Sequence, residues 1–211
     1  VMCKINFKKT LPYIGSILFM IILSYIYFSP DILEGKVLFQ GDTQQGIAIG
    51  QEGKAFREAT GETTRWTNSL FSGMPNFQIS PSYANNYWMG QIGRIYHLGL
   101  QSPASLVFIM MLGFFILLSA MKIRWYLALV GAIAYAFSSY FFIIIGAGHI
   151  WKFITLAYIP PTIAGIILAY RGKYIGGAAL IGFFGMMQIT SNHIQMSYYF
   201  MFFIAALVIA Y

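Results

Sequence analysis

The sequence predicts an all-α fold, a polytopic bundle of transmembrane helices with one long loop on the outer side of the membrane. Apolar residues make up 58% of the chain and charged residues only 9%, whereas a soluble domain carries about a quarter charged residues. The apolar residues also form runs of roughly 17 to 20, long enough to cross the hydrocarbon layer as helices. Because lipid offers the backbone no hydrogen-bond partners, these runs must be helical.

Six apolar segments are the predicted spans. In chain order they cover residues 11–28, 104–121, 125–145, 153–170, 174–190 and 196–211. The chain therefore divides into residues 1–29, the N-terminus with the first span; residues 30–103, an extracytoplasmic loop; and residues 104–211, a bundle of about five helices. Because residue 211 lies inside an apolar run, we expect the bundle to continue and the sequence to be the N-terminal portion of a longer protein.

The basic residues of the short loops predict the orientation. Lysines precede the first span, and two short loops between later spans carry Lys122 with Arg124 and Arg171 with Lys173. An excess of Lys and Arg in short loops marks the cytoplasmic side. We therefore expect a multi-pass protein with a cytoplasmic N-terminus and with residues 30–103 outside. Lys152 is the exception, since it falls on the outer side.

The long outer loop holds all six carboxylates, between Asp31 and Glu62. A carboxylate that serves as a base, a nucleophile or a metal ligand must therefore come from this loop. Glu52, Glu58 and Glu62 alternate with basic residues, which is typical of a solvated helix face with ion pairs. Residues 43–60 and 83–98 are predicted as helices that lie on the membrane surface, the second with aromatic side chains in helical register.

Asp42 differs from the other carboxylates. It follows a glycine, has no basic residue nearby in the sequence and stands at the start of the first predicted surface helix. One interpretation is an N-cap, in which the side chain accepts a hydrogen bond from the first-turn amides. The other is a general base that takes a proton from a substrate hydroxyl near the membrane surface. The two interpretations are compatible.

Polar residues also gather at the outer ends of the last four spans. His149 and Lys152 are three residues apart and share a helix face, as do Asn192 and Gln195, with His193 between them. Each could simply mark the water interface. However, ionisable groups near membrane depth usually face the protein interior or a water-filled cavity. Lys and His side chains without a nearby carboxylate favour an anion, most simply a phosphate or pyrophosphate.

Other classes of site find less support in the sequence. The net charge is +7, but no basic run is interleaved with exposed aromatics, so no nucleic-acid partner is predicted. Two histidines and Asp42 would be a legitimate metal-ligand set, but no short ligand spacing is present and no metal ligands are predicted. Nucleotide-binding and hydrolase signatures are missing. The single cysteine, Cys3, excludes an internal disulfide framework.

A series of short motifs runs in order through nearly the whole chain. They are Phe28-Ser29-Pro30, Leu33-Glu34-Gly35-Lys36, Asp42-x-Gln44-Gln45, Trp66-Thr67-Asn68-Ser69, Gly73-Met74-Pro75, Phe137-Ser138-Ser139-Tyr140, Ala147-Gly148-His149, Ala157-Tyr158-x-Pro160-Pro161 and Asn192-His193-x-Gln195-Met196. The set resembles the YfhO family of bacterial membrane proteins, most closely its Bacteroidetes branch.

This resemblance implies a GT-C-type glycosyltransferase of the bacterial inner membrane and cell envelope. Such an enzyme moves a sugar from a polyprenyl-phosphate carrier to an acceptor on the outer, periplasmic face, so the implied partners are this donor and membrane lipids. The resemblance implies that Asp42 is the catalytic base. Candidates for binding the carrier phosphate are His149, Lys152 and His193. Residues expected to orient the sugar or phosphate are Gln44, Gln45, Asn192 and Gln195.

Many relatives of this fold carry a second acidic residue beside the first. Here Thr43 and Gln44 follow Asp42, so a divalent metal cofactor is doubtful. Two other functions stay open. A transporter or flippase for an anionic lipid-linked substrate would need polar residues through the membrane, whereas here they collect on one side. If the protein were a non-catalytic membrane assembly subunit, variants of every polar residue would have phenotypes that do not depend on an enzymatic activity.

Overall fold

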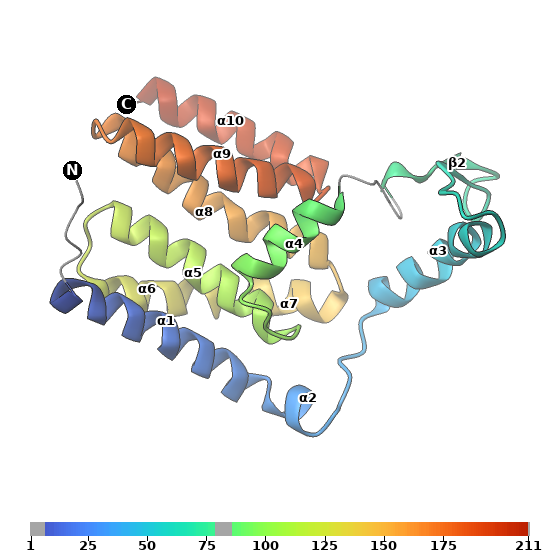
Figure 1. Cartoon of the computed structure of the whole chain (residues 1–211), viewed down its shortest axis with the longest axis horizontal. Helices are drawn as coiled ribbons and strands as arrows, with labels where there is room; N and C mark the ends of the chain where they lie inside the picture. Colours follow the sequence, from blue (N-terminus) through green and yellow to red (C-terminus); the bar gives the residue numbers. More distant parts are fainter. Residues whose placement is uncertain (1–6, 79–85, 211) are drawn as a thin grey trace.

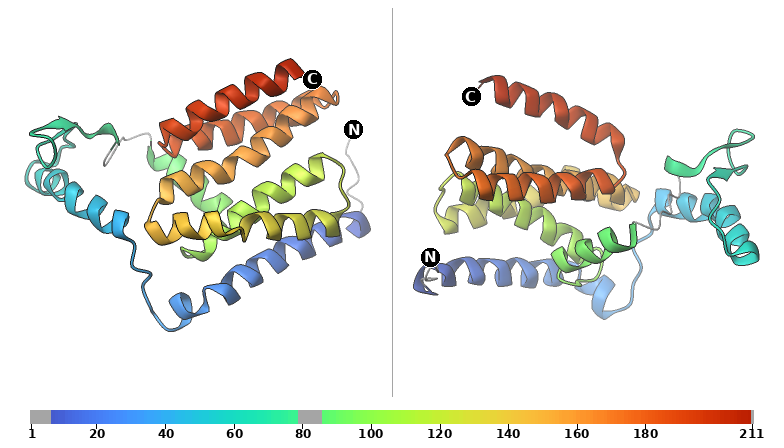
Figure 2. Two further views of the ribbon diagram at one scale, coloured as in Figure 1. Left: turned by 180° about the vertical axis from the view of Figure 1, so that it is seen from behind. Right: turned by 45° about the horizontal axis from the view of Figure 1, so that its top comes forward.

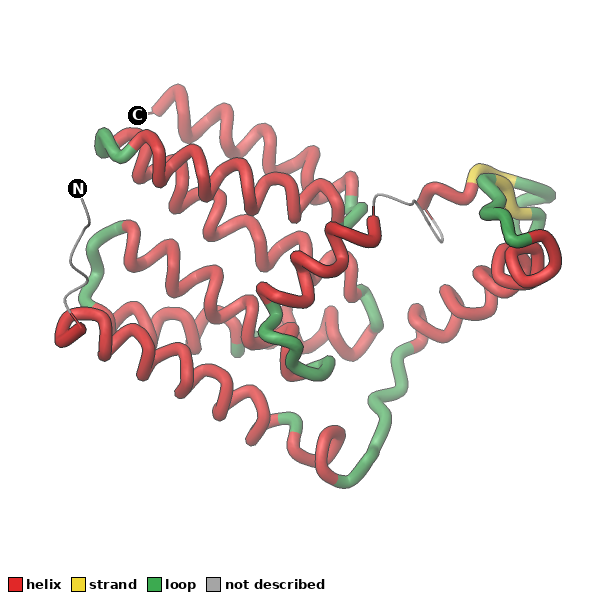
Figure 3. The backbone as a smooth tube through the Cα atoms, viewed as in Figure 1, coloured by secondary structure: helices red, strands yellow, loops and turns green. Residues whose placement is uncertain are grey.

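The computed structural model describes residues 7–78 and 86–210, and these fold almost entirely into helices, with one short two-stranded hairpin (Figure 3). Cys3 and the beginning of the predicted segment 83–98 lie outside the described residues. Within the described residues, helices cover most of each predicted span. These are α1 (Phe7–Tyr27), α5 (Ala104–Ala120), α6 (Trp125–Ala136), α7 (Ser139–Ala147), α8 (Ile150–Tyr170), α9 (Tyr174–Thr190) and α10 (Ile194–Ala210).

These helices lie side by side, from α1 at one edge to α10 at the other (Figure 1). Within the described ranges, α1 and α8 are long and apolar enough to cross a membrane, and α6 with α7 makes a third if the bent pair is one span. The remaining apolar helices, α5, α9 and α10, are shorter, with 17 residues each. The prediction of an all-α chain with membrane-spanning helices is confirmed to this extent.

The predicted third span is not one straight helix. α6 and α7 meet at an angle of 46°. Ser138, between them, has φ −65° and ψ 143°, which is extended backbone and cannot continue an α-helix. The predicted span over residues 125–145 therefore consists of two helices, α6 and α7, joined at a bend.

Glycine residues at the contacts between the central helices let these helices approach closely. A Cβ atom at Gly113 of α5 would lie 2.5 Å from the Ala157 carbonyl oxygen of α8, and one at Gly177 of α9 would lie 2.7 Å from the Gly165 carbonyl oxygen of α8. Small residues at such contacts are typical of helices that pack in lipid. Around these contacts lies an apolar core, in which Phe108 of α5 is completely buried.

The long loop begins with the short helix α2 (Ser29–Leu33) and continues into α3 (Gly41–Thr60). Strands β1 (Trp66–Thr67) and β2 (Met74–Pro75) then pair antiparallel, with Trp66 opposite Pro75. A 3₁₀ helix, η1 (Asn76–Gln78), and helix α4 (Asn86–Tyr96) follow. Figure 2 shows α3 and the hairpin projecting beyond one end of the long helices, and α4 crossing them at that same end. The start of α1 and the end of α10 lie at the opposite end.

Glu52 of α3 holds the hairpin in place. Its carboxylate accepts hydrogen bonds from Thr67 Oγ1 at 2.7 Å, Asn68 N at 2.8 Å, Asn68 Nδ2 at 3.0 Å and Ser69 Oγ at 2.9 Å. These bonds, led by that from Thr67, lower the pKa of Glu52 to about 2. The prediction of an ion-paired face was wrong for Glu52, although Glu58 does lie 3.8 Å from the ammonium group of Lys54.

Candidate functional site

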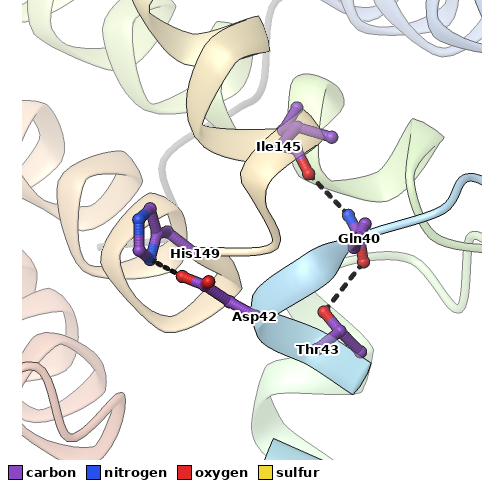
Figure 4. Close-up of polar contacts among 5 residues, drawn as sticks. All are labelled: Gln40, Asp42, Thr43, Ile145 and His149. Atoms are coloured by element: carbon purple, nitrogen blue, oxygen red, sulfur yellow. Dashed lines mark hydrogen bonds and ion pairs between the residues drawn. The ribbon is translucent and has the colours of Figure 1, made fainter. Parts of the chain in front are cut away.

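The N-terminal end of α3 is held against the turn that joins α7 to α8 (Figure 4). Gln40, the residue before α3, donates its Nε2 to the Ile145 carbonyl oxygen at 2.6 Å, and Thr43 Oγ1 donates to Gln40 Oε1 at 3.0 Å. The last carbonyl groups of a helix have no partner inside it. At the end of α7 the Ile145 carbonyl oxygen also accepts from Gly148 N at 3.1 Å, so Gln40 supplies a second donor to it and ties the long loop to the helices.

Gly148 makes this close approach possible. Its φ is +92°, and a Cβ atom there would lie 2.8 Å from Thr43 Oγ1 and 2.9 Å from Thr43 N. The position thus needs a residue that adopts the left-handed conformation and has no side chain. Sequence reasoning assigned no role to Gly148 or Gln40. A glycine that ends an apolar run is a signal for a helix C-terminus, but no local signal marks Gln40.

Asp42 and His149 meet at this contact. Asp42 Oδ2 lies 2.8 Å from His149 Nδ1, and each side chain is about half exposed. Asp42 is in the first turn of α3, but the N-cap is Gln40 and makes no side-chain capping bond. The N-cap interpretation of Asp42 was therefore wrong, because the carboxylate faces the imidazole across the contact (Figure 4). The other carboxylate oxygen of Asp42, Oδ1, takes no part in this contact with His149.

Lys152 and His193 complete a group of basic side chains around His149. The Lys152 ammonium is half-buried and lies 5.5 Å from the centre of the Tyr140 ring, a distance at which a cation is attracted to the ring face. In the described part of the chain it forms no ion pair with a carboxylate. Burial, with smaller contributions from the charges of Lys152 and His149, holds the pKa of His193 below its ordinary value. At neutral pH the His193 imidazole is therefore uncharged.

A cavity of about 1110 Å³ connects these groups. It lies between α3, the start of α8 and the turn before α10. The predicted site residues that line it are Asp42, Gln45, His149, Lys152 and His193. Tertiary structure has thus brought the outer loop and two distant turns to one open cavity.

Three other predicted residues do not line this cavity. Gln44 is exposed, and Gln195 is exposed with its Nε2 donating to Tyr199 OH at 3.2 Å. Asn192 donates its Nδ2 to the Phe77 carbonyl oxygen at 2.9 Å. This last bond ties η1 to the turn between α9 and α10, so the Asn192 amide holds the loop in position.

The cavity suits transfer chemistry on an anionic substrate. A carboxylate with one free oxygen can accept a proton, and its bonded imidazole is held in one orientation. A lysine ammonium and a neutral imidazole can both donate hydrogen bonds to a phosphate. Within residues 7–78 and 86–210, no three His, Cys, Asp or Glu side chains lie close enough together to hold a metal ion.

The resemblance noted in the motifs rests on the residues alone. Comparing the chain with protein-family models, with curated proteins and with solved structures gives no match in any of the three.

Proposed function

We propose that the protein is a polytopic glycosyltransferase of the bacterial inner membrane. It moves a sugar from a polyprenyl-phosphate carrier to an acceptor hydroxyl on the outer face. The observation that carries this proposal is the contact between Asp42 and His149 at 2.8 Å, in a cavity that Lys152 and His193 also line.

The arrangement of the turns supports the proposed orientation. The turns after α5 and α8, which carry Lys122 with Arg124 and Arg171 with Lys173, lie at the end of the helices away from α3 (Figures 1 and 2). Basic turns mark the cytoplasmic side, which supports an outer position for α3 and the cavity. At a rise of about 1.5 Å per residue, the 17-residue helices are at the short limit for a span.

The proposed reaction uses these groups as follows. The acceptor oxygen attacks the anomeric carbon while its proton passes to the free carboxylate oxygen of Asp42. The bond between the anomeric carbon and the phosphate oxygen breaks, and the carrier phosphate leaves with that electron pair. Lys152 and His193 stabilise the charge that develops on the phosphate. Attack from the side opposite the leaving group inverts the anomeric centre.

His149 and Gln45 support this step. The bond from His149 Nδ1 fixes the Asp42 carboxylate, so that its second oxygen points to one place in the cavity. Gln45, one turn along α3 from Asp42, lines the same wall. Its amide can both donate to and accept from sugar hydroxyls.

The test is the Asp42→Asn variant, assayed in liposomes for transfer from a panel of polyprenyl-phosphate sugars. Asparagine keeps the shape of the side chain but is not a base, so we expect transfer to fall by at least about a hundredfold. Asp31→Asn, another carboxylate of the same loop, is the matched control and should retain activity. Full transfer by a folded Asp42→Asn protein would overturn the proposal.

A further inference from the structure

A second cavity, of about 600 Å³, lies between α4, the start of α8 and the end of α9. Its wall is mostly apolar, with Met89 from α4, Ile154 from α8 and Met187 from α9. Trp151 lines both this cavity and the first one. The proposed transfer reaction uses none of the groups that line the second cavity.

The second cavity has one permanent charge. Arg94, near the end of α4, is exposed and is the only Lys, Arg, Asp or Glu among its lining residues. In the described ranges the Arg94 guanidinium forms no ion pair with a carboxylate. The first cavity, in contrast, is lined by Asp42 and Glu58 as well as by basic residues. The second cavity therefore favours an anion, whereas the first has charges of both signs.

A polar pair lies deeper in the second cavity. His97 Nε2 lies 3.2 Å from the Tyr158 hydroxyl. Burial lowers the pKa of His97, so the imidazole is uncharged at neutral pH and adds no charge to that of Arg94. This pair can exchange hydrogen bonds with a neutral ester or hydroxyl group.

The setting of α4 indicates where such a ligand comes from. The helix crosses the ends of the long helices, and its Tyr87 and Trp88 side chains are exposed. Exposed aromatics of this kind lie at the headgroup level of a bilayer. The headgroup of a lipid in the same leaflet would therefore contact Arg94, and its acyl chain would contact the apolar wall.

We propose that this second cavity binds one anionic phospholipid, with Arg94 on the phosphodiester and the first part of an acyl chain against Met89, Ile154 and Met187. A guanidinium matches the geometry of a phosphodiester, because two parallel N–H groups meet two oxygens. The binding is separate from sugar transfer and can be measured without it.

Gly90 offers a way to close the cavity without disturbing the fold. It lines the cavity, and a Cβ atom there would meet nothing within 4 Å. Leucine at this position would extend into the cavity and is a better helix former than glycine. Gly182 of α9 also has open space within 4 Å but does not line the cavity, so Gly182→Leu is the matched control.

The experiment measures equilibrium binding of labelled dioctanoyl-phosphatidylglycerol to the purified protein in a neutral detergent. We expect Gly90→Leu to abolish saturable binding and Gly182→Leu to leave it unchanged. Arg94→Gln should weaken it about tenfold, the effect of losing one charge-assisted contact. Dioctanoyl-phosphatidylcholine should bind the parent protein about tenfold more weakly, because its headgroup has no net charge. Thermal unfolding of each variant confirms that it is folded.

Three outcomes would overturn the proposal. Equal binding of the two lipids, unaffected by Arg94→Gln, would mean that the cavity does not recognise an anion. Displacement by millimolar inorganic phosphate would indicate a site for free phosphate. Displacement by polyprenyl phosphate would assign the cavity to the path of the sugar carrier. Because no transfer is assayed, a failure of the proposed transferase reaction would not alter any of these results.

Discussion

Two carboxylates of α3, Asp42 and Glu52, illustrate how one helix serves two purposes. Glu52 accepts four hydrogen bonds from the hairpin that follows α3, and these lower its pKa to about 2. Asp42 meets one imidazole and keeps an oxygen free at the wall of a large cavity. A carboxylate with all its acceptor sites used stabilises structure, while one with a free oxygen is available for chemistry.

Among variants that keep both carboxylates, the largest effect is expected where the contact between α3 and the turn after α7 is broken. In Gly148→Ala the new Cβ would lie 2.8 Å from Thr43 Oγ1, in a backbone conformation that alanine rarely adopts. We expect α3 to shift and transfer to fall about hundredfold, as small misplacements of catalytic groups do. The measurement is the initial rate in liposomes. Gly146→Ala, where a Cβ meets nothing within 4 Å, is the control, and equal rates for the two variants would contradict the role of Gly148.

A smaller loss is expected when the ammonium group of Lys152 is removed from the cavity. Lys152→Met keeps the length of the side chain but has no ammonium to stabilise the leaving phosphate. We expect kcat/KM for the lipid-linked donor to fall about ten- to hundredfold, with Lys152→Arg retaining part of the activity. Lys173→Met, in the turn before α9, should have no effect. An unchanged kcat/KM for Lys152→Met would show that Lys152 does not stabilise the leaving phosphate.

The smallest effect on catalysis is expected for Glu52→Gln. Because the pKa of Glu52 is about 2 instead of its ordinary 4.5, its contribution to stability is present above pH 4.5 and is lost as the pH falls toward 2. The protection factor of the Asn68 amide, the ratio of its intrinsic to its observed hydrogen-exchange rate at the same pH, should therefore fall in this window, and in Glu52→Gln it should be low even at neutral pH. Transfer should remain near the parent rate. Glu62→Gln is the control, and slow exchange at Asn68 in Glu52→Gln would contradict the assignment.

The positions of the helices were largely predictable from the sequence. Helix α9 begins at Tyr174 and ends at Thr190, the predicted limits, and α5 differs by one residue at its end. Apolar runs and the turns that separate them are local properties, because each helix forms its backbone hydrogen bonds within a single segment. The helical extent of α3 likewise matches the prediction, except that the helix begins at Gly41 rather than at residue 43.

The sequence by itself thus determined the helical class of this protein, the segments that become helices and the location of all six carboxylates in one loop. Only the tertiary structure decided that Asp42 faces His149, that Glu52 binds the hairpin and that His97 meets Tyr158 in a second cavity. These contacts join residues far apart in the chain, so no local pattern records them. They depend on backbone features such as the left-handed Gly148 and the break at Ser138, which set where each helix points.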